Sequence, residues 1–187
     1  MTETPWPEVQ PELTDGVVSL RPWRADDAQW VYESCQDPEV QRWTRVSVPY
    51  LMKDAEGFVG PFASHQWSGG NGAPFAVIDT ESGLGIGAAG LIINDPTSRV
   101  AEAGYWTSAS ARGRGFTPRA LELLSTWALH DGGIMRLELL IEEENSASRK
   151  VAERAGYSYE GLLVKKVLHR GQQRNMAMYA RTNQTSN

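Results

Sequence analysis

The alternation of apolar and polar positions predicts a helical first part of the chain and a strand-rich remainder. In the first part, one short strand is followed by three helical stretches, and glycine and asparagine residues then predict an exposed loop. The strand is expected at 17–22, the helices from Asp26 to Asp37, through 40–43 and over about 50–59, and the loop at 68–72.

The remainder predicts an antiparallel meander, a strong amphipathic helix and a second group of strands. The meander is expected at 74–79, 85–94 and 100–107. The helix follows Thr117, because Leu121, Leu124 and Leu129 share one face. Beyond it we expect a strand at 135–142, a short helix at 148–155 ended by Gly156, and a closing hairpin of strands 160–169 and 175–181.

Length and composition favour one domain. The chain has 187 residues, of which 41% are hydrophobic and 22% charged, so it can bury a substantial single core. We expect this domain to cover 1–187, with 1–12 as an acidic, proline-broken N-terminal arm and 182–187 as a polar tail.

Charge and cysteine content exclude several classes of function. Lysine and arginine number 18 against 23 acidic residues, a net charge of −5, which disfavours nucleic acid as a partner. The single cysteine, Cys35, allows no internal disulfide, and the three histidines are too far apart for a local metal motif, so no metal is expected. No secretory signal or membrane-spanning run is recognisable, so we expect a cytoplasmic protein without a membrane partner.

One glycine-rich segment imitates a dinucleotide fingerprint. Gly85 to Gly90 match the pattern G-x-G-x-x-G, but that fingerprint must lie between a strand and a helix. Here a short β-type run and a turn at Asp95-Pro96 follow. The glycines are therefore expected inside a strand, where another backbone or a ligand passes closely.

A second segment, 112–118, has the right surroundings for an anion site. It follows a strand and precedes the amphipathic helix, and its glycines leave backbone N–H groups open. Thr117 is expected as the helix N-cap with Pro118 at the first helical position. Arg112, Arg114 and Arg119 add three cations. The sequence therefore predicts a phosphate-binding loop, with a solvated basic helix cap as the alternative.

These signals together resemble the GNAT acyl-CoA N-acyltransferases. Segment 112–117 is similar to the arginine/glutamine-x-x-glycine-x-glycine/alanine pyrophosphate loop of that family. The second family signature follows at the expected spacing, and an opening strand and helix and a central strand also match. These matching segments are Asn145-Ser146-Ala147-Ser148 with Ala155-Gly156-Tyr157, Leu20-Arg21-Pro22 with Ala25-Asp26-Asp27, and Ala103-Gly104-Tyr105-Trp106. Within the family the chain looks most like the RimJ/RimL-type branch.

The resemblance implies an α/β (α+β) fold in which a mixed, mostly antiparallel sheet, flanked by helices, is splayed so that acetyl-CoA can enter. It also implies which residues bind that donor. Thr117 departs from the pattern, because a branched residue stands where the family has glycine or alanine. The implied donor-binding residues are Trp106, Thr107, Arg112, Gly113, Arg114, Gly115, Phe116, Thr117 and Asn145, the last of which holds either pantetheine or an N-terminal backbone group of the helix.

Amine acylation needs a base for the amine and an acid for the departing thiolate. By resemblance, Glu102 is the candidate base and Ser148 the candidate acid. The alternative for Glu102 is a charge on a solvated sheet face, and for Ser148 an ordinary helix-start serine. In RimL-like proteins another base lies after the second signature, but the corresponding residue here is Val167, and Glu160 falls earlier in that strand.

The resemblance implies that the acceptor is a primary amine, first a protein or peptide N-terminus, second an antibiotic, polyamine or amino acid. A non-catalytic acyl-CoA-binding module is the rival from another class. Trp43, Trp67 and a loop at 64–72 are expected to shape the acceptor pocket, and Glu142-Glu143-Glu144 could attract a cationic amine. The chain is expected to be a monomer or a homodimer.

Overall fold

The computed structural model describes residues 6–183. Part of the predicted arm (1–5) and part of the predicted tail (184–187) lie outside the described residues. No helix within 6–183 is long and apolar enough to cross a membrane.

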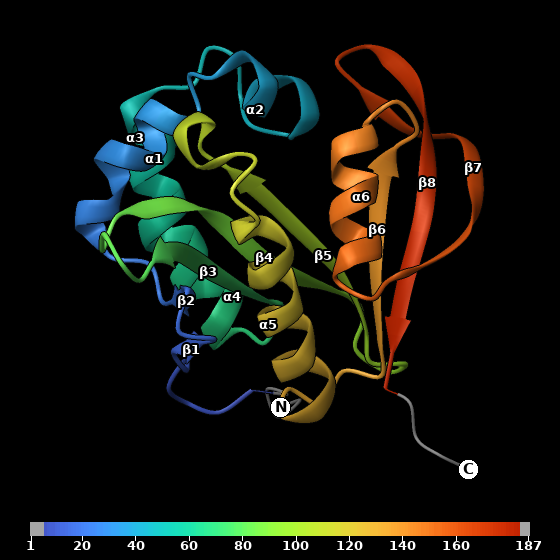
Figure 1. The fold of residues 1–187 in the computed structure, drawn as a ribbon, viewed down its shortest axis with the longest axis horizontal. Helices are drawn as coiled ribbons and strands as arrows, with labels where there is room; N and C mark the ends of the chain where they lie inside the picture. The colour runs from blue at the N-terminus through green and yellow to red at the C-terminus, as the bar shows by residue number, and fades with distance from the viewer. Residues whose placement is uncertain (1–5, 184–187) are drawn as a thin grey trace.

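An open, mostly antiparallel sheet of eight strands runs through the molecule (Figure 1). Its spatial order is β1-β2-β3-β4-β5-β6-β8-β7, and only the β5–β6 pair is parallel. The predicted fold class is therefore confirmed, as are the meander and the closing hairpin. The strands are β1 (Leu13–Thr14), β2 (Val18–Arg21), β3 (Gly72–Asp79), β4 (Gly85–Asp95), β5 (Val100–Thr107), β6 (Arg136–Glu142), β7 (Ser158–His169) and β8 (Gln172–Thr182).

Two helices, α5 (Phe116–His130) and α6 (Ser146–Arg154), cover one face of the sheet (Figure 1). The segment between β2 and β3 forms the other helical layer. Its elements are the 3₁₀ turn η1 (Ala25–Asp27), α1 (Ala28–Ser34), α2 (Pro38–Trp43), α3 (Met52–Gly57), the π-helical turn η2 (Phe58–Phe62) and α4 (Ala63–Ser68); a further 3₁₀ turn, η3 (Ala109–Ala111), follows β5. The loop predicted over 64–72 is therefore wrong for 64–68, which are helical.

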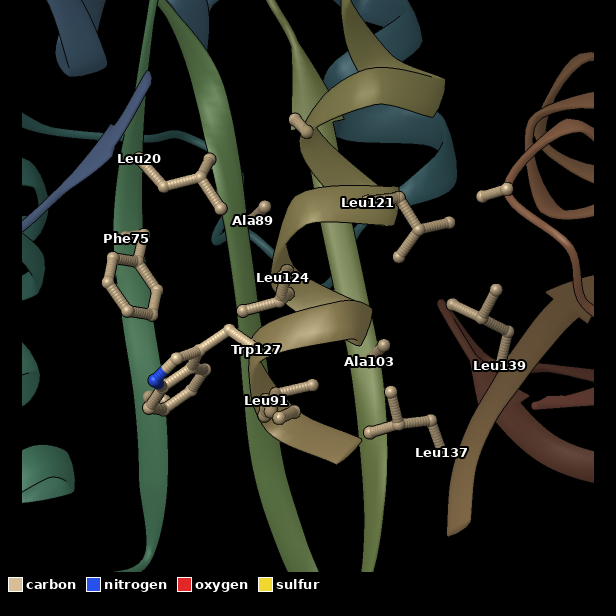
Figure 2. Close-up of a cluster of buried hydrophobic side chains, with 14 of the residues drawn as sticks. Leu20, Phe75, Ala89, Leu91, Ala103, Leu121, Leu124, Trp127, Leu137 and Leu139 are labelled. Atoms are coloured by element: carbon tan, nitrogen blue, oxygen red, sulfur yellow. The ribbon is translucent and has the colours of Figure 1, made fainter. Parts of the chain in front are cut away.

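The main core lies between the sheet and α5 (Figure 2). Alternation along β6 buries Leu137, Leu139 and Ile141 on the α5 side, as the sequence predicts. Trp127 of α5 packs over β3 against Phe75, with ring centroids 5.7 Å apart. This core fixes α5, and with it the loop at its N-terminus, relative to the sheet.

Two tryptophans correct the sequence analysis. Trp6, in the predicted arm, is only 4% exposed and packs on Trp67 and Trp127 at 5.8 and 5.6 Å between centroids. Trp67 itself is buried in this cluster, so it is a core residue and does not line an acceptor pocket. Large aromatic area buried in the core outweighs the local polarity of both segments.

The sheet opens between β5 and β6. Among the described residues, these strands pair only from Val100 to Glu102 with Arg136 to Glu138. β5 continues to Thr107, paired with β4 alone. The β6-facing edge of 103–107 is therefore free of a strand partner, and this wedge is the splay that the resemblance implies.

Candidate active site

The loop after β5 has the backbone of an anion site. Gly113 and Gly115 have φ of +75° and +80°, and a Cβ placed on either would meet no atom within 4 Å. α5 begins at Phe116 with Gly115 as its left-handed N-cap, so the prediction of Thr117 as N-cap is wrong. A left-handed conformation is open to glycine but strained for other residues, which is why the chain enters the helix through Gly115.

Each arginine near this loop has a carboxylate beside it. Arg112 lies 2.6 Å from Asp37, and Arg119 lies 2.9 Å from Asp15. Arg114 reaches Asp79 at 3.8 Å. The Arg112 guanidinium lowers the pKa of Asp37 below its usual value. The loop therefore offers an anion the open N–H groups at the start of α5 and not three free cations.

The wedge fits an extended thioester arm. The free backbone edge of Trp106 and Thr107 faces the opening, as expected for amide pairing with pantetheine. The Thr107 and Thr117 hydroxyl oxygens lie 2.7 Å apart and join β5 to α5. Thr117 thus turns its hydroxyl toward the strand. The donor residues inferred from the sequence are brought together along one path from α5 into the wedge.

A cavity of about 820 Å³ extends from this wedge under α2 and α3. Its floor comes from β4, β5 and β6, and one of its walls is aromatic. Its lining includes Trp23, Trp43, Tyr50, Phe58, Phe62, Ile92, Glu102, Gly104, Trp106, Leu140, Glu142, Asn145, Ser148, Val167 and His169. Trp43 and Trp67 were both predicted to shape the acceptor pocket. Trp43 lines the cavity, whereas Trp67 does not.

Glu102 lies at the point where β5 and β6 part. Its Cα partners are Ile92 on β4 and Glu138 on β6, and its side chain lines the cavity. Within 6–183 the Glu102 carboxylate has no hydrogen bond or ion pair. A carboxylate held in this way is available to bind an ammonium group or to accept its proton.

Ser148 lies across the wedge, in the first turn of α6. Its backbone N–H donates to the Asn145 side chain at 3.0 Å, so Asn145 caps the helix. The Ser148 hydroxyl is 2.8 Å from the Tyr105 hydroxyl, which also donates to the Ser148 carbonyl at 3.1 Å. Burial raises the pKa of Tyr105 above its usual value, so its hydroxyl keeps its proton. The Ser148 hydroxyl is therefore held on a fixed partner at the cavity edge.

The other candidate base positions behave differently. Val167 lines the cavity, where it can transfer no proton. Glu160 forms an ion pair with Arg136, which lowers the pKa of the Glu160 carboxyl. Glu160 is not among the cavity residues. Of these three positions, only Glu102 brings a carboxylate to the cavity.

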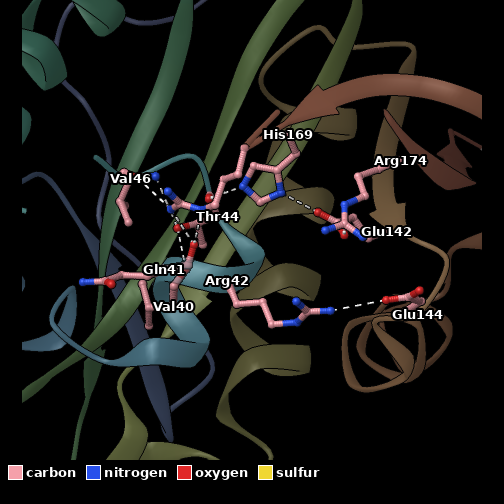
Figure 3. Close-up of polar contacts among 10 residues, drawn as sticks. Val40, Gln41, Arg42, Thr44, Val46, Glu142, Glu144, His169 and Arg174 are labelled. Carbon is pink, nitrogen blue, oxygen red and sulfur yellow. Dashed lines mark hydrogen bonds and ion pairs between the residues drawn. The ribbon is translucent and has the colours of Figure 1, made fainter. Parts of the chain in front are cut away.

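A polar cluster includes three of the lining residues, Thr44, Glu142 and His169 (Figure 3). His169, at the end of β7, contacts Glu142 through Nδ1 at 2.6 Å and the Thr44 carbonyl oxygen through Nε2 at 3.2 Å. Arg174 lies 3.7 Å from the same Glu142 carboxylate. The cluster ties the segment after α2 to β6 and to the closing hairpin.

The acidic run Glu142-Glu143-Glu144 is thus largely paired. Glu142 is bound as just described, Glu143 accepts from Asn175 at 3.0 Å, and Glu144 lies 3.3 Å from Arg42. Sequence reasoning considered this run as an attractant for amines and did not foresee its partners. The Nε2 contact joins residues 125 positions apart in the chain, and no local pattern records such a pairing.

The fold, the anion loop and the wedge define an acyl-CoA-dependent transferase. A family model of the acetyltransferase (GNAT) domain matches residues 18–158. The chain therefore belongs to the GNAT family and is an acetyl-CoA-dependent acetyltransferase.

Known proteins similar to the chain agree with this assignment. An uncharacterized N-acetyltransferase, p20 of Bacillus licheniformis, is 25% identical over 146 residues, which cover 78% of this chain and 82% of p20. Mycobacterium smegmatis RimJ in complex with CoA-disulfide is 24% identical with a TM-score of 0.83, covering 96% of this chain and 89% of that one. A putative ribosomal-protein-serine acetyltransferase from Vibrio cholerae is 21% identical with a TM-score of 0.80, covering 95% and 99%. The two structural likenesses show the fold.

Proposed function

We propose that this acetyltransferase acetylates the N-terminal α-amine of a peptide or protein by direct attack in a ternary complex. The observation that carries the proposal is the Glu102 carboxylate at the point where β5 and β6 part, which no described residue pairs with, together with the Ser148 hydroxyl on the facing helix. Protein acetyltransferases with the same fold support a protein acceptor, and one of them, the RimL ribosomal L7/L12 α-N-protein acetyltransferase, supports an N-terminal amine.

Acetyl-CoA, when bound, supplies an activated acetyl group as a thioester. The open N–H groups from Gly113 to Phe116 would hold its pyrophosphate, and the free edge of β5 would hold its pantetheine arm. A compact anion suits the open N–H groups of a glycine loop, and an extended arm with amide groups suits the unpaired edge of the strand that precedes the loop.

Glu102 acts on the acceptor. An aliphatic amine is mostly protonated near neutral pH, so Glu102 first pairs with the ammonium group and then takes a proton from it, directly or through a water. The neutral nitrogen attacks the acyl carbon, the C–N bond forms and the C–S bond breaks. Glu102 releases the first proton to solvent before attack, so it can take the second proton, which the positively charged nitrogen carries after the C–N bond has formed. The departing thiolate takes its proton from solvent.

Ser148 acts on the leaving group. Its hydroxyl donates a hydrogen bond to the developing thiolate without itself ionising. Tyr105 is a positioning residue here, because its single proton can go to the Ser148 carbonyl oxygen or to the Ser148 Oγ. When it goes to Oγ, the Ser148 proton is directed away from Tyr105 toward the wedge.

The test uses one peptide with a free N-terminus and an internal lysine, and the same peptide with its N-terminus blocked. After incubation with acetyl-CoA, fragment mass spectra locate the new acetyl group. We expect it on the α-amine of the first peptide and expect no reaction of the second. Acetylation of the lysine, or of polyamines and aminoglycosides only, would refute the proposal.

A further inference from the structure

An aromatic wall, formed by Trp23, Phe58, Phe62 and Trp106, runs along one side of the cavity. Trp23 meets Phe58 edge to face at 5.1 Å between centroids, and Phe58 stacks on Phe62 at 5.6 Å. Phe62 is 41% exposed although it is a large apolar residue. An apolar surface of this kind inside a substrate cavity favours an apolar ligand group.

A further aromatic ring supports the wall from behind. Trp30 packs behind it, 5.5 Å from Trp23 and 5.9 Å from Trp106, and its indole N–H donates to Asp27 at 2.8 Å. Phe58 and Phe62 are presented by the π-helical turn η2. Such turns are rare and are frequent at functional sites. A preformed wall loses little entropy when a ligand packs on it.

The floor in front of the wall is bare. Gly90 on β4 faces Gly104 on β5 in the sheet register, between Glu102 and Trp106 on the cavity side of β5. A Cβ on Gly104 would meet no atom within 4 Å, and its φ does not require glycine. The space next to Glu102 is thus open, and no side chain of its own strand fills it.

The charges in the cavity point to one place for an ammonium group. Of the lining carboxylates, Glu142 is bound to His169, and Asp54 accepts from the Ser47 hydroxyl and the Leu51 N–H. Among the described lining residues this leaves the Glu102 carboxylate unpaired. Arg45 and Lys53 line the opposite, α2–α3 side. A cation is therefore favoured beside Glu102 and disfavoured beneath α3.

We propose that the acceptor carries a bulky apolar or aromatic group next to its primary amine. The amine binds at Glu102, and the apolar group crosses the Gly90–Gly104 floor to pack on the aromatic wall. Leucine or phenylalanine at a peptide N-terminus has this chemistry, as has a small arylalkyl amine. The inference rests on the proposed function for its amine chemistry and adds a selection against small N-terminal residues such as serine and alanine.

The experiment compares peptides that differ only in their first residue. One pair begins with phenylalanine or leucine and the other with serine or alanine, and phenethylamine and ethylamine form a parallel small-molecule pair. Burying a side chain of this size favours the apolar member by about 10- to 100-fold in kcat/KM. If the apolar member is preferred only among the peptides, the acceptor is a peptide. If phenethylamine is preferred over ethylamine but the peptides show no preference, the acceptor is a small-molecule amine.

Two variants show whether the wall is responsible. Phe62→Ala removes the most exposed ring of the wall, and we expect the ratio of phenylalanine to serine peptide to fall at least several-fold. Phe62→Leu should restore part of that ratio. Leu84→Ala is the matched control, because Leu84 is 66% exposed in the β3–β4 turn and does not line the cavity. Its ratio should equal that of the wild type.

Binding provides a readout independent of turnover. The acetylated phenylalanine peptide should quench the tryptophan fluorescence at lower concentration than the acetylated serine peptide does. Equal or reversed order in both binding and kcat/KM, or a ratio that Phe62→Ala leaves unchanged, overturns the inference. If no amine is acetylated although acetyl-CoA binds, the proposed function fails, and the order of peptide binding still decides the inference.

Discussion

Gly115 offers the sharpest perturbation of the donor site, because its conformation and its surroundings are both known. Its φ is +80°, and a Cβ there would meet no protein atom within 4 Å. In Gly115→Leu the side chain would therefore project into open space at the loop without a clash inside the protein, and we expect it to obstruct the proposed pyrophosphate site. Gly83→Leu is a matched control, since Gly83 has φ of +71°, equally open space and a place in the β3–β4 turn.

The expected magnitudes follow from these two conformations. A left-handed conformation costs a residue with a side chain about 1–2 kcal/mol. For a chain of this length each kcal/mol lowers the melting temperature by about 2–4 °C, so both variants should melt about 2–8 °C below the wild type. A ligand at 100 times its Kd stabilises the native state by about 2.7 kcal/mol. The wild type should therefore gain about 5–11 °C with acetyl-CoA.

The assay is thermal unfolding with and without acetyl-CoA, with NAD as the ligand control. Without ligand, the melting temperature of Gly83→Leu should lie below that of the wild type, and acetyl-CoA should raise it by about 5–11 °C, the full shift expected for the wild type. The melting temperature of Gly115→Leu should be equally low without ligand, and acetyl-CoA should not raise it. A full rise in Gly115→Leu would refute the assignment of this loop to the pyrophosphate, and a rise with NAD would refute the choice of donor.

The remaining predictions concern the reacting groups and the core. Glu102→Gln should lower kcat/KM by about 10²- to 10⁴-fold while the melting shift with acetyl-CoA persists, and full turnover would remove Glu102 from the mechanism. Ser148→Ala should lower kcat by about 10²-fold, and a substrate with a better thiol leaving group should be affected less; equal losses would contradict the acid role. Trp127→Ala should destabilise the fold by about 3–5 kcal/mol in denaturant unfolding, because its ring packs on Trp6, Trp67 and Phe75. Burial raises the pKa of the Cys35 thiol to about 11, so a thiol reagent at pH 8 should label Cys35 only after unfolding, and rapid native labelling would contradict its burial.

Local pattern predicted most of the fold. The alternation of Leu137, Leu139 and Ile141 predicted which side chains of β6 are buried. The glycines of 85–90 lie inside β4, as expected. A Cβ on Gly87 would lie 2.3 Å from the Trp106 carbonyl oxygen, which is the predicted close approach of another backbone. These features depend on neighbours in sequence or on a two-residue period, which a sequence displays directly.

Helix starts and tryptophan roles were less predictable. Thr117 and Pro118 are a favourable N-cap pair, but Gly115 can take the left-handed conformation that starts α5 one residue before Thr117. Trp43 and Trp67 were both expected at the acceptor pocket, yet Trp43 lines the cavity and Trp67 enters the core. Only the packing of distant elements decides between those outcomes.

Candidate donor residues could be chosen from local motifs, whereas the shape of the cavity could not be predicted in that way. The donor loop is contiguous, so its motif could be recognised within 112–117. The candidate acceptor cavity combines η2, α2, β5 and the β7–β8 hairpin, and its Thr44–His169 contact joins residues 125 positions apart in the chain. The open floor at Gly104 and the aromatic wall appear only when those elements are assembled.

The most direct test of the central claim measures free thiol released from acetyl-CoA together with acetyl amide formed on an N-terminal amine. The account predicts that both products appear in equal amounts, and that Glu102→Gln suppresses both while acetyl-CoA still binds. If the wild type binds acetyl-CoA and releases no thiol with any member of a broad amine panel, the chain acts as a binding module and the account of catalysis is contradicted.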